Sequence, residues 1–199
     1  SVLDLIQTVE ALGRAEAFLK DVAGRGGLVL LVGTRPAARK AILEVYDRTK
    51  TPYFVERWIG GTLTNFKVIR KRVEYLETLE KEKAGGELEK YTKKERMKKE
   101  EEMVRLVKMF NGLRTLTRLP DAIFVVDTTH DTTAVREARR MKIPIVGLCD
   151  TNANAGLIDY PIPSNDDALP AVRYMVNRIG AAIEEGMRAK NMVMDEAAG

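Results

Sequence analysis

Three short runs of uninterrupted apolar residues constrain the fold of this chain more than any other feature. They lie at residues 28–32, 122–126 and 145–148. A strand that is apolar at every position is buried on both faces, as in a parallel sheet covered by helices on each side. Helical patterns separate the runs, and such alternation predicts an α/β, doubly wound, mostly parallel sheet.

The remaining elements of this domain are predicted from apolar periodicity and from turn residues. Residues 3–22 carry apolar side chains at three- and four-residue steps and are expected to form the first helix, which the glycines from 24 to 27 end. The last helix is expected to begin with Asn165 or Asp166 as its cap. The other predicted elements are helices over residues 36–49, 133–141 and 166–190 and strands over residues 53–55 and 160–163.

One long charged stretch interrupts this alternation. A helix from about residue 64 to 83 carries a narrow apolar seam, glycines 85 and 86 break it, and a second charged helix follows with its own seam. Two seams joined through a glycine break predict an antiparallel coiled-coil helical hairpin. We therefore expect an α/β domain (residues 1–63 and 112–199) with a hairpin insertion (residues 64–111). The seam residues are Phe66, Ile69, Val73, Leu76 and Leu79 on the first helix and Met103, Leu106, Val107 and Phe110 on the second.

Composition narrows the function only slightly. The formal net charge of +4 is compatible with an anionic partner without requiring one. Cys149 is the only cysteine, which excludes an internal disulfide and suggests a reducing compartment. No apolar stretch approaches the roughly 20 residues that span a bilayer, so we expect no membrane partner. We also expect no signal peptide.

The segment after the second predicted strand combines three chemistries at fixed spacing. Gly60 and Gly61 indicate a backbone bend, and the hydroxyl of Thr62 or Thr64 can cap the helix that follows. Trp58, the only tryptophan, is either a stacking platform or part of the core. A bend, an aromatic ring and a basic helix N-terminus together suggest a surface that meets phosphates. The structural residues of this motif are Trp58, Gly60, Gly61, Thr64 and Asn65.

Basic residues gather in two clusters. One surrounds the bend and the first turns of the next helix, and the other lies on the return helix, so the two are expected on adjacent arms of the hairpin. Phosphate contacts and stacking of this kind are typical of RNA recognition, whereas solubility is an equal alternative for the second cluster. The candidate RNA-binding residues are Arg57, Lys67, Arg70, Lys71 and Arg72 in the first cluster and Lys93 and Lys94 in the second, with Arg96, Lys98 and Lys99 beside them.

The turn around Gly33 is the strongest sign of an enzyme or a nucleotide-binding protein. A dinucleotide fold places its phosphate loop between a buried strand and a helix. The fingerprint needs three spaced glycines, however, and here only Gly33 stands in the turn, without a phosphate-loop lysine. We interpret Gly33 as turn geometry and leave Arg35 and Arg39 as residues that could face a phosphate.

Aspartates follow the predicted strands at the edge where open α/β sheets bind ligands. They are Asp127, Asp150 and the pair Asp166-Asp167, and they either hold Mg²⁺ or, as we favour, cap helices and fix turns. His130, the only histidine, has no partner for a usual zinc site. We therefore expect no catalytic residues, no cofactor and no small-molecule substrate.

Five blocks of residues run in order through most of the chain. They are Arg-Trp-Ile-Gly-Gly-Thr-Leu-Thr-Asn-Phe at 57–66, Arg-Leu-Pro-Asp-Ala-Ile-Phe-Val-Val-Asp at 118–127, Ala-Val-Arg-Glu-Ala at 134–138, Ile-Pro-Ile-Val-Gly-Leu-Cys-Asp-Thr-Asn at 143–152 and Ile-Asp-Tyr-Pro-Ile-Pro-Ser-Asn-Asp-Asp-Ala at 158–168. In this order they resemble the bacterial-type small-subunit ribosomal protein two family.

The resemblance implies a flavodoxin-like α/β domain with a protruding coiled-coil hairpin. It also implies a structural constituent of the small ribosomal subunit with no catalytic task in translation. The implied partners are small-subunit rRNA and neighbouring ribosomal proteins, including the large mRNA-binding protein one, on a cytoplasmic or organellar ribosome. At the matching positions, Arg57, Trp58, the Gly60-Gly61 bend and residues 67–72 would seat the protein against RNA and its neighbours.

The sequence departs from the family pattern in two places. Members usually carry His-Phe-Gly-His and Arg-Arg-Trp-Asn-Pro motifs before the first helix, and this sequence starts after both, so we expect their contacts to be absent. Members often have Pro-Arg-Lys-Glu after the aspartate at 127, where this chain has Thr-Thr-His-Asp, which weakens any basic or metal role for that loop. Two other functions stay open: a nucleotide-binding enzyme on the doubly wound fold, or a coiled-coil adaptor protein.

Overall fold

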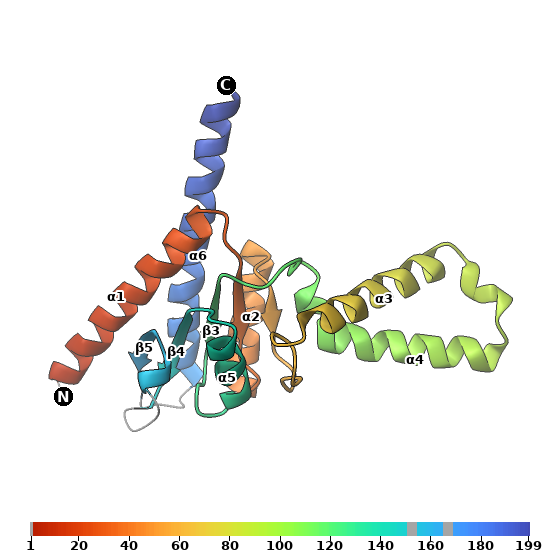
Figure 1. Ribbon diagram of the computed structural model, residues 1–199, viewed down its shortest axis with the longest axis horizontal. Helices are drawn as coiled ribbons and strands as arrows, with labels where there is room; N and C mark the ends of the chain where they lie inside the picture. Colours follow the sequence, from red (N-terminus) through yellow and green to blue (C-terminus); the bar gives the residue numbers. More distant parts are fainter. Residues whose placement is uncertain (1, 151–154, 165–168) are drawn as a thin grey trace.

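The described residues form a five-stranded parallel sheet with helices on both faces (Figure 1). The computed structural model describes residues 2–150, 155–164 and 169–199. The strands lie in the order β2-β1-β3-β4-β5, each parallel to its neighbour. This is the flavodoxin-like order, in which the winding reverses between β1 and β3, so the predicted fold is confirmed. The strands are β1 (Val29–Val32), β2 (Tyr53–Phe54), β3 (Ala122–Val125), β4 (Ile145–Cys149) and β5 (Tyr160–Pro163).

Helices of different parts of the chain cover the two faces of the sheet. Three of them lie on one face, and α5 and the base of the α3–α4 hairpin lie on the other. None of the helices in the described part of the chain is long and apolar enough to cross a membrane. The helices are α1 (Val2–Gly24), α2 (Pro36–Thr49) and α6 (Leu169–Ala198) on the first face, and α3 (Phe66–Ala84), α4 (Lys93–Phe110) and α5 (Thr132–Arg140) on the second, with short 3-10 turns at Glu87–Lys90, Asn111–Leu113 and Ala155–Leu157.

Side chains of the buried strands alternate between two apolar cores. Leu31 and Phe124 point to the face covered by α1, α2 and α6, and Leu30 and Ile123 point to the other. All four are at most 1% exposed. Successive residues of a strand point to opposite faces, so a strand covered on both sides has no position left for a polar side chain. This explains the uninterrupted apolar runs.

The α3–α4 pair is an antiparallel hairpin that projects from the sheet (Figure 1). Arg72 near the start of α3 lies over the Phe110 ring at the end of α4, and Lys83 near the end of α3 lies 3.8 Å from Glu100 in the first half of α4, so the two helices run in opposite directions. The predicted seam residues are buried or half-buried, and they continue into the core beneath the sheet. Coiled-coil winding of the two helices and the domain boundaries at residues 64 and 111 stay predictions.

Two helices differ from what the sequence predicts, α6 in its extent and α1 in its burial. α6 ends at Ala198, eight residues beyond the expected 190, and its last turns run past the sheet (Figure 1). Its expected caps, Asn165 and Asp166, lie outside the described residues. In α1 the apolar stripe is buried only in its second half, and Leu5 and Val9 are 65% and 62% exposed. The reason is that α1 runs out beyond the edge strand β5 towards its N-terminus (Figure 1), although Thr8 still reaches the Pro163 carbonyl.

Candidate nucleic-acid interface

One carboxylate from α5 holds the segment between β2 and α3. Oε2 of Glu137 accepts hydrogen bonds from the Trp58 indole N–H at 2.7 Å and from the Gly61 N–H at 3.1 Å. Oε1 accepts from the backbone N–H groups of Leu63 and Thr64, both at 3.1 Å, and from the Thr64 hydroxyl at 3.0 Å. Five donors from one loop therefore converge on a single side chain.

The environment of Glu137 favours its ionised form. The residue is 7% exposed. Burial alone would raise the pKa of its carboxyl, but the hydrogen bonds from the Trp58 indole and from three backbone N–H groups outweigh burial and hold that pKa below its ordinary value. Glu137 is thus a buried anion whose charge is stabilised by hydrogen bonds from the loop it organises.

The predicted capping of α3 by Thr62 or Thr64 is wrong. The Thr62 hydroxyl donates to the Ile59 carbonyl at 2.6 Å, and the Thr64 hydroxyl donates to Glu137. Asn65 stands at the N-cap position, and its side chain makes no capping hydrogen bond. The loop that leads into α3 is therefore held by Glu137 of α5, and α3 has no side-chain cap of its own.

Trp58 lies at the edge of the apolar core. It is half-buried, with its ring centroid 5.2 Å from that of Phe54. The predicted bend is present, but only Gly61 has a left-handed conformation (φ 93°), whereas Gly60 has open space around it. The backbone therefore requires glycine at position 61 and not at position 60.

The basic residues of the first cluster are engaged to different degrees. Arg57, Lys67 and Lys71 are exposed, with no ion pair to another described residue. Arg70 is half-buried, and its guanidinium donates to the Arg114 carbonyl at 3.4 Å. Arg72 lies over the Phe110 ring at 5.1 Å. Arg70 and Arg72 thus hold the base of the hairpin together. Arg57, Lys67 and Lys71 instead present their charges to solvent.

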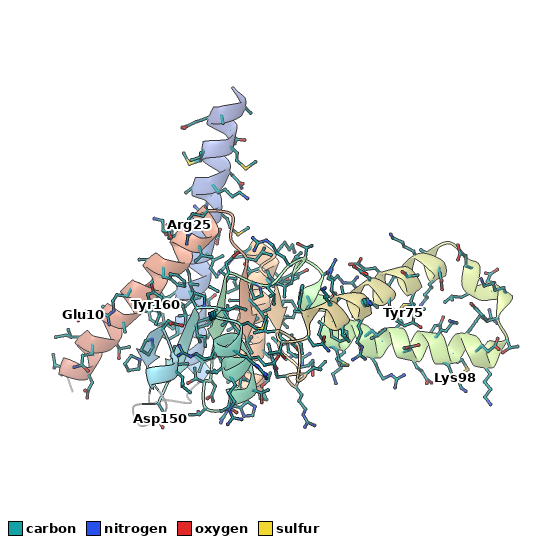
Figure 2. All side chains as sticks on the ribbon, in the orientation of Figure 1. Glu10, Arg25, Tyr75, Lys98, Asp150 and Tyr160 are labelled. Atoms are coloured by element: carbon teal, nitrogen blue, oxygen red, sulfur yellow. The ribbon has the colours of Figure 1, made fainter. Side chains whose placement is uncertain are left out.

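The second cluster lies at the opposite end of the hairpin. Lys93 and Lys94 are exposed on the first turn of α4, directly after Thr92, which forms a capping box with Glu95. Lys98 lies on the outer side of the same helix (Figure 2). α3 has 19 residues, which corresponds to a length of about 28 Å. The two clusters are on adjacent arms, as predicted, but the structure does not bring them together.

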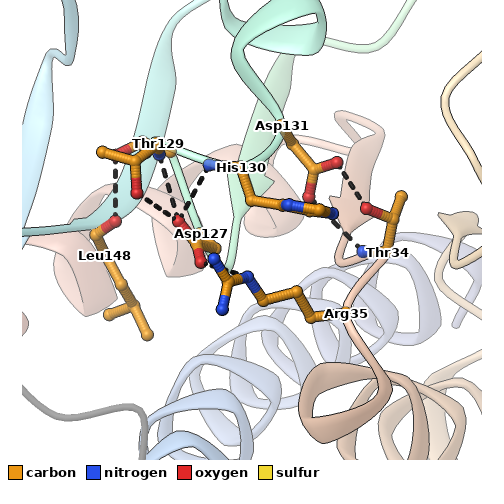
Figure 3. Close-up of polar contacts among 8 residues, drawn as sticks. Thr34, Arg35, Asp127, Thr129, His130, Asp131 and Leu148 are labelled. Atoms are coloured by element: carbon orange, nitrogen blue, oxygen red, sulfur yellow. Dashed lines mark hydrogen bonds and ion pairs between the residues drawn. The ribbon is translucent and has the colours of Figure 1, made fainter.

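A cleft of about 330 Å³ opens at the carboxyl ends of β1 and β3, where the winding of the sheet reverses. Arg35 Nε lies 2.8 Å from Asp127, and the hydroxyl of Thr34 donates to Asp131 at 2.6 Å (Figure 3). Asp127 also accepts from the backbone N–H groups of Thr129 and His130. Burial opposes its ionisation, but these hydrogen bonds, that of the Thr129 hydroxyl and the nearby Arg35 outweigh it and lower the pKa of Asp127.

This cleft does not resemble a phosphate site. Asp127, Asp131 and Asp150 line it, and the cationic head of Arg35 is already paired. Arg39, the other arginine expected near a phosphate, pairs with Glu56 at 2.6 Å. Asp127 fixes a turn, as favoured from sequence, while Asp166 and Asp167 lie outside the described residues. Within the described ranges, no group of three or more His, Cys, Asp or Glu side chains is placed to hold a metal.

Glu137 is the functional residue that sequence reasoning missed. It lies inside the block at 134–138, yet nothing was assigned to it. A signal was available, because Glu137 falls on the buried face of α5 beside Ala134 and Ala138, where an acidic residue needs several hydrogen-bond donors. The groups that donate hydrogen bonds to Glu137 lie 73 to 79 positions earlier in the chain, so no local sequence pattern indicates them.

Comparison with known proteins gives one consistent result. A family model described as Ribosomal protein S2 matches residues 1–186. Proteins named small ribosomal subunit protein uS2 are 42% identical over 99% of this chain and 75% of the relative in Roseiflexus castenholzii, and 46% identical over 89% of this chain and 69% of the relative in Thermus thermophilus. The relative from Chloroflexus aurantiacus is 43% identical over 96% of this chain and 80% of its own length. The chain therefore belongs to the ribosomal protein S2 family.

Proposed function

We propose that this chain is a structural constituent of the small ribosomal subunit, working in translation on cytoplasmic ribosomes. The observation that carries the proposal is the family match, which extends over residues 1–186. Its relatives are named as small-subunit proteins. The partners are small-subunit rRNA and neighbouring ribosomal proteins, including the large mRNA-binding protein one. The role is one of binding and positioning, without catalysis.

We infer that RNA contacts lie on two parts of the hairpin. Arg57, Lys67 and Lys71 are exposed and unpaired beside the entry to α3, so their charges are available to phosphates. Arg70 and Arg72 add positive potential there while they fasten the base of the hairpin. Lys93 and Lys94 would contact a separate stretch of RNA near the distal end of the hairpin.

The loop held by Glu137 gives the proximal contacts their precision. Trp58, Gly61 and Thr64 are tied to α5, and α3 begins two residues later with Lys67 in its first turn. A rigid entry means that little conformational entropy is lost when the lysines meet their phosphates. Trp58, Gly61 and Thr64 thus form a structural motif at the RNA-facing surface, whereas Gly60 has open space around it and Asn65 makes no side-chain cap.

The test is the salt dependence of binding to small-subunit rRNA. Lys67→Gln combined with Lys71→Gln should weaken binding and flatten the plot of log K against log salt by about 0.7–0.9 for each lost contact. Lys40→Gln combined with Lys142→Gln is the matched control, because both lysines are exposed and lie outside this cluster. An unchanged slope in the Lys67/Lys71 variant would remove this surface from the interface.

A further inference from the structure

A second cavity, of about 190 Å³, opens at the amino-terminal edge of the sheet, opposite the acidic cleft. It lies where α6 leaves the domain, between the ends of α1 and α2. Its floor is apolar and includes Val29 and Ile183, both 2% exposed. Lys50 and Lys190 line the cavity, and no acidic side chain is among the described residues that line it.

The two lysines of this cavity have no anionic partner among the described residues. Lys50 ends α2 in a left-handed conformation (φ 57°), and its ammonium lies 4.9 Å from the Tyr46 ring. Lys190 is half-buried on α6, and its Nζ would lie 3.0 Å from a Cβ placed on Gly26. The ammonium of Lys190 therefore lies beside Gly26, which also lines the cavity.

Neighbouring arginines differ from these lysines because they are already paired. Arg25 lies 3.0 Å from Asp21, and Arg118 lies 2.8 Å from Asp121. Lys50 and Lys190 therefore give the lining of this cavity a positive charge that no described acidic lining residue offsets. A lining of this charge favours an anionic ligand.

The threonines of the cavity are already engaged, so the lysines and the exposed Asn191 amide are its side-chain donors. The Thr49 hydroxyl donates to the Val45 carbonyl and is paired with the Thr51 hydroxyl at 2.7 Å. The Thr115 hydroxyl donates to the Lys50 carbonyl. A cavity below the 300–1,000 Å³ that drug-sized ligands fill suits a single compact anionic group and not a whole nucleotide.

We propose that this cavity holds one backbone phosphate of small-subunit rRNA between Lys50 and Lys190. The inference rests on the proposed function, which supplies the polyanion, and the charge complementarity of the cavity supplies the site. The bound phosphate would join α6 to the end of α2, and so fasten the base of the α6 extension that otherwise leaves the domain unsupported (Figure 1).

The test compares two double variants in rRNA binding across a salt series. Lys50→Gln with Lys190→Gln removes the proposed site. Lys40→Gln with Lys142→Gln removes the same charge elsewhere, and Lys142 has a φ of 58°, which matches the backbone of Lys50. Because both cavity lysines serve one phosphate, we expect the slope to flatten by about 0.7–0.9 and affinity to fall about five- to eightfold at 0.1 M salt. The control pair should change neither quantity to that extent.

Acetylation of the wild-type chain gives an independent measurement. In the presence of rRNA, Lys50 and Lys190 should react more slowly, and mass spectrometry should show Lys40 and Lys142 unchanged. If the wild-type chain does not bind rRNA, the proposed function and this inference both fail. If it binds and the cavity variant behaves like the control, only the phosphate site is wrong. Normal rRNA affinity with reduced incorporation into subunits would assign the cavity to an acidic protein segment and overturn the proposal.

Discussion

Replacing Glu137 by glutamine tests the central structural claim about the loop before α3. The substitution keeps the shape of the side chain and changes one acceptor oxygen into an amide that donates. If the remaining oxygen stays with Leu63 and Thr64, the new amide faces the N–H groups of Trp58 and Gly61, which then lose their acceptor.

The magnitude follows from the two hydrogen bonds that are lost. Hydrogen bonds to a charged group contribute about 1.5–3 kcal/mol each, so the lower end of their sum is about 3 kcal/mol. Water can reach the half-buried Trp58, which favours that lower end. In a chain of this size, 1 kcal/mol lowers Tm by about 2–4 °C, so Glu137→Gln should lower it by about 6–12 °C.

Thermal unfolding measured by circular dichroism gives the stability, and the fluorescence of Trp58, the only tryptophan, reports on the loop. Glu101→Gln is the control, because Glu101 is exposed on α4 and should change stability by less than about 0.5 kcal/mol. A Tm for Glu137→Gln as close to wild type as that of the control, with unchanged fluorescence, would refute the role given to this carboxylate.

The same carboxylate predicts a dependence on pH. Its pKa is lower in the folded chain than in the unfolded chain, so the folded state binds fewer protons. The stabilisation is therefore complete above the unfolded value of about 4.3 and is lost as the pH falls through the folded pKa. The difference in Tm between wild type and Glu137→Gln should narrow in acid, and a constant difference down to the acid transition would contradict this reading.

Three further predictions concern the cleft, the hairpin and a helix crossing. Calorimetry should find no ATP, GTP or NAD binding tighter than about 1 mM, because carboxylates line the cleft at the switch point; micromolar binding that depends on Arg35 would contradict it. Replacing residues 71–107 by a short glycine linker should leave the α/β domain cooperatively folded, and a broad, non-cooperative thermal transition would show that the hairpin belongs to the core. Gly186→Ala should cost about 1–3 kcal/mol, because its Cβ would clash with the Lys20 carbonyl, whereas Gly13→Ala in open space should stabilise α1; equal stabilities by denaturant unfolding would contradict the close approach of α1 and α6.

The fold could be predicted because each element has its own local pattern of apolar residues in the sequence. Strands such as β1 and β3 are apolar at every position, since both faces are covered. The seam of α3 repeats every three or four residues, because only one stripe of that helix is buried. Helix ends were less predictable: α6 runs on to Ala198, and no glycine or proline between residues 190 and 198 interrupts it.

The candidate site could be predicted only in part, because its contacts join distant positions. The basic residues of α3 were identified from sequence, but their state was not: Arg70 reaches the Arg114 carbonyl, 44 positions later. Lys50 and Lys190 meet at one cavity although 140 positions separate them in the chain. Side-chain pairing of this kind depends on tertiary packing, which has no periodic signature in the sequence.

The two edges of the sheet differ in how they would meet the phosphates of an RNA. Turns and helix N-termini at the carboxyl ends of parallel strands present backbone N–H groups, which attract anions. Here that edge supplies its own anions: Asp127 accepts from the N–H groups of Thr129 and His130, and Asp131 accepts from Thr34. Because these carboxylates already accept the hydrogen bonds of the N–H groups, the N–H groups offer little attraction to a phosphate that enters the cleft. Unpaired cations lie elsewhere, on the entry to α3 and at the opposite edge of the sheet, and phosphates of an extended polyanion should collect there.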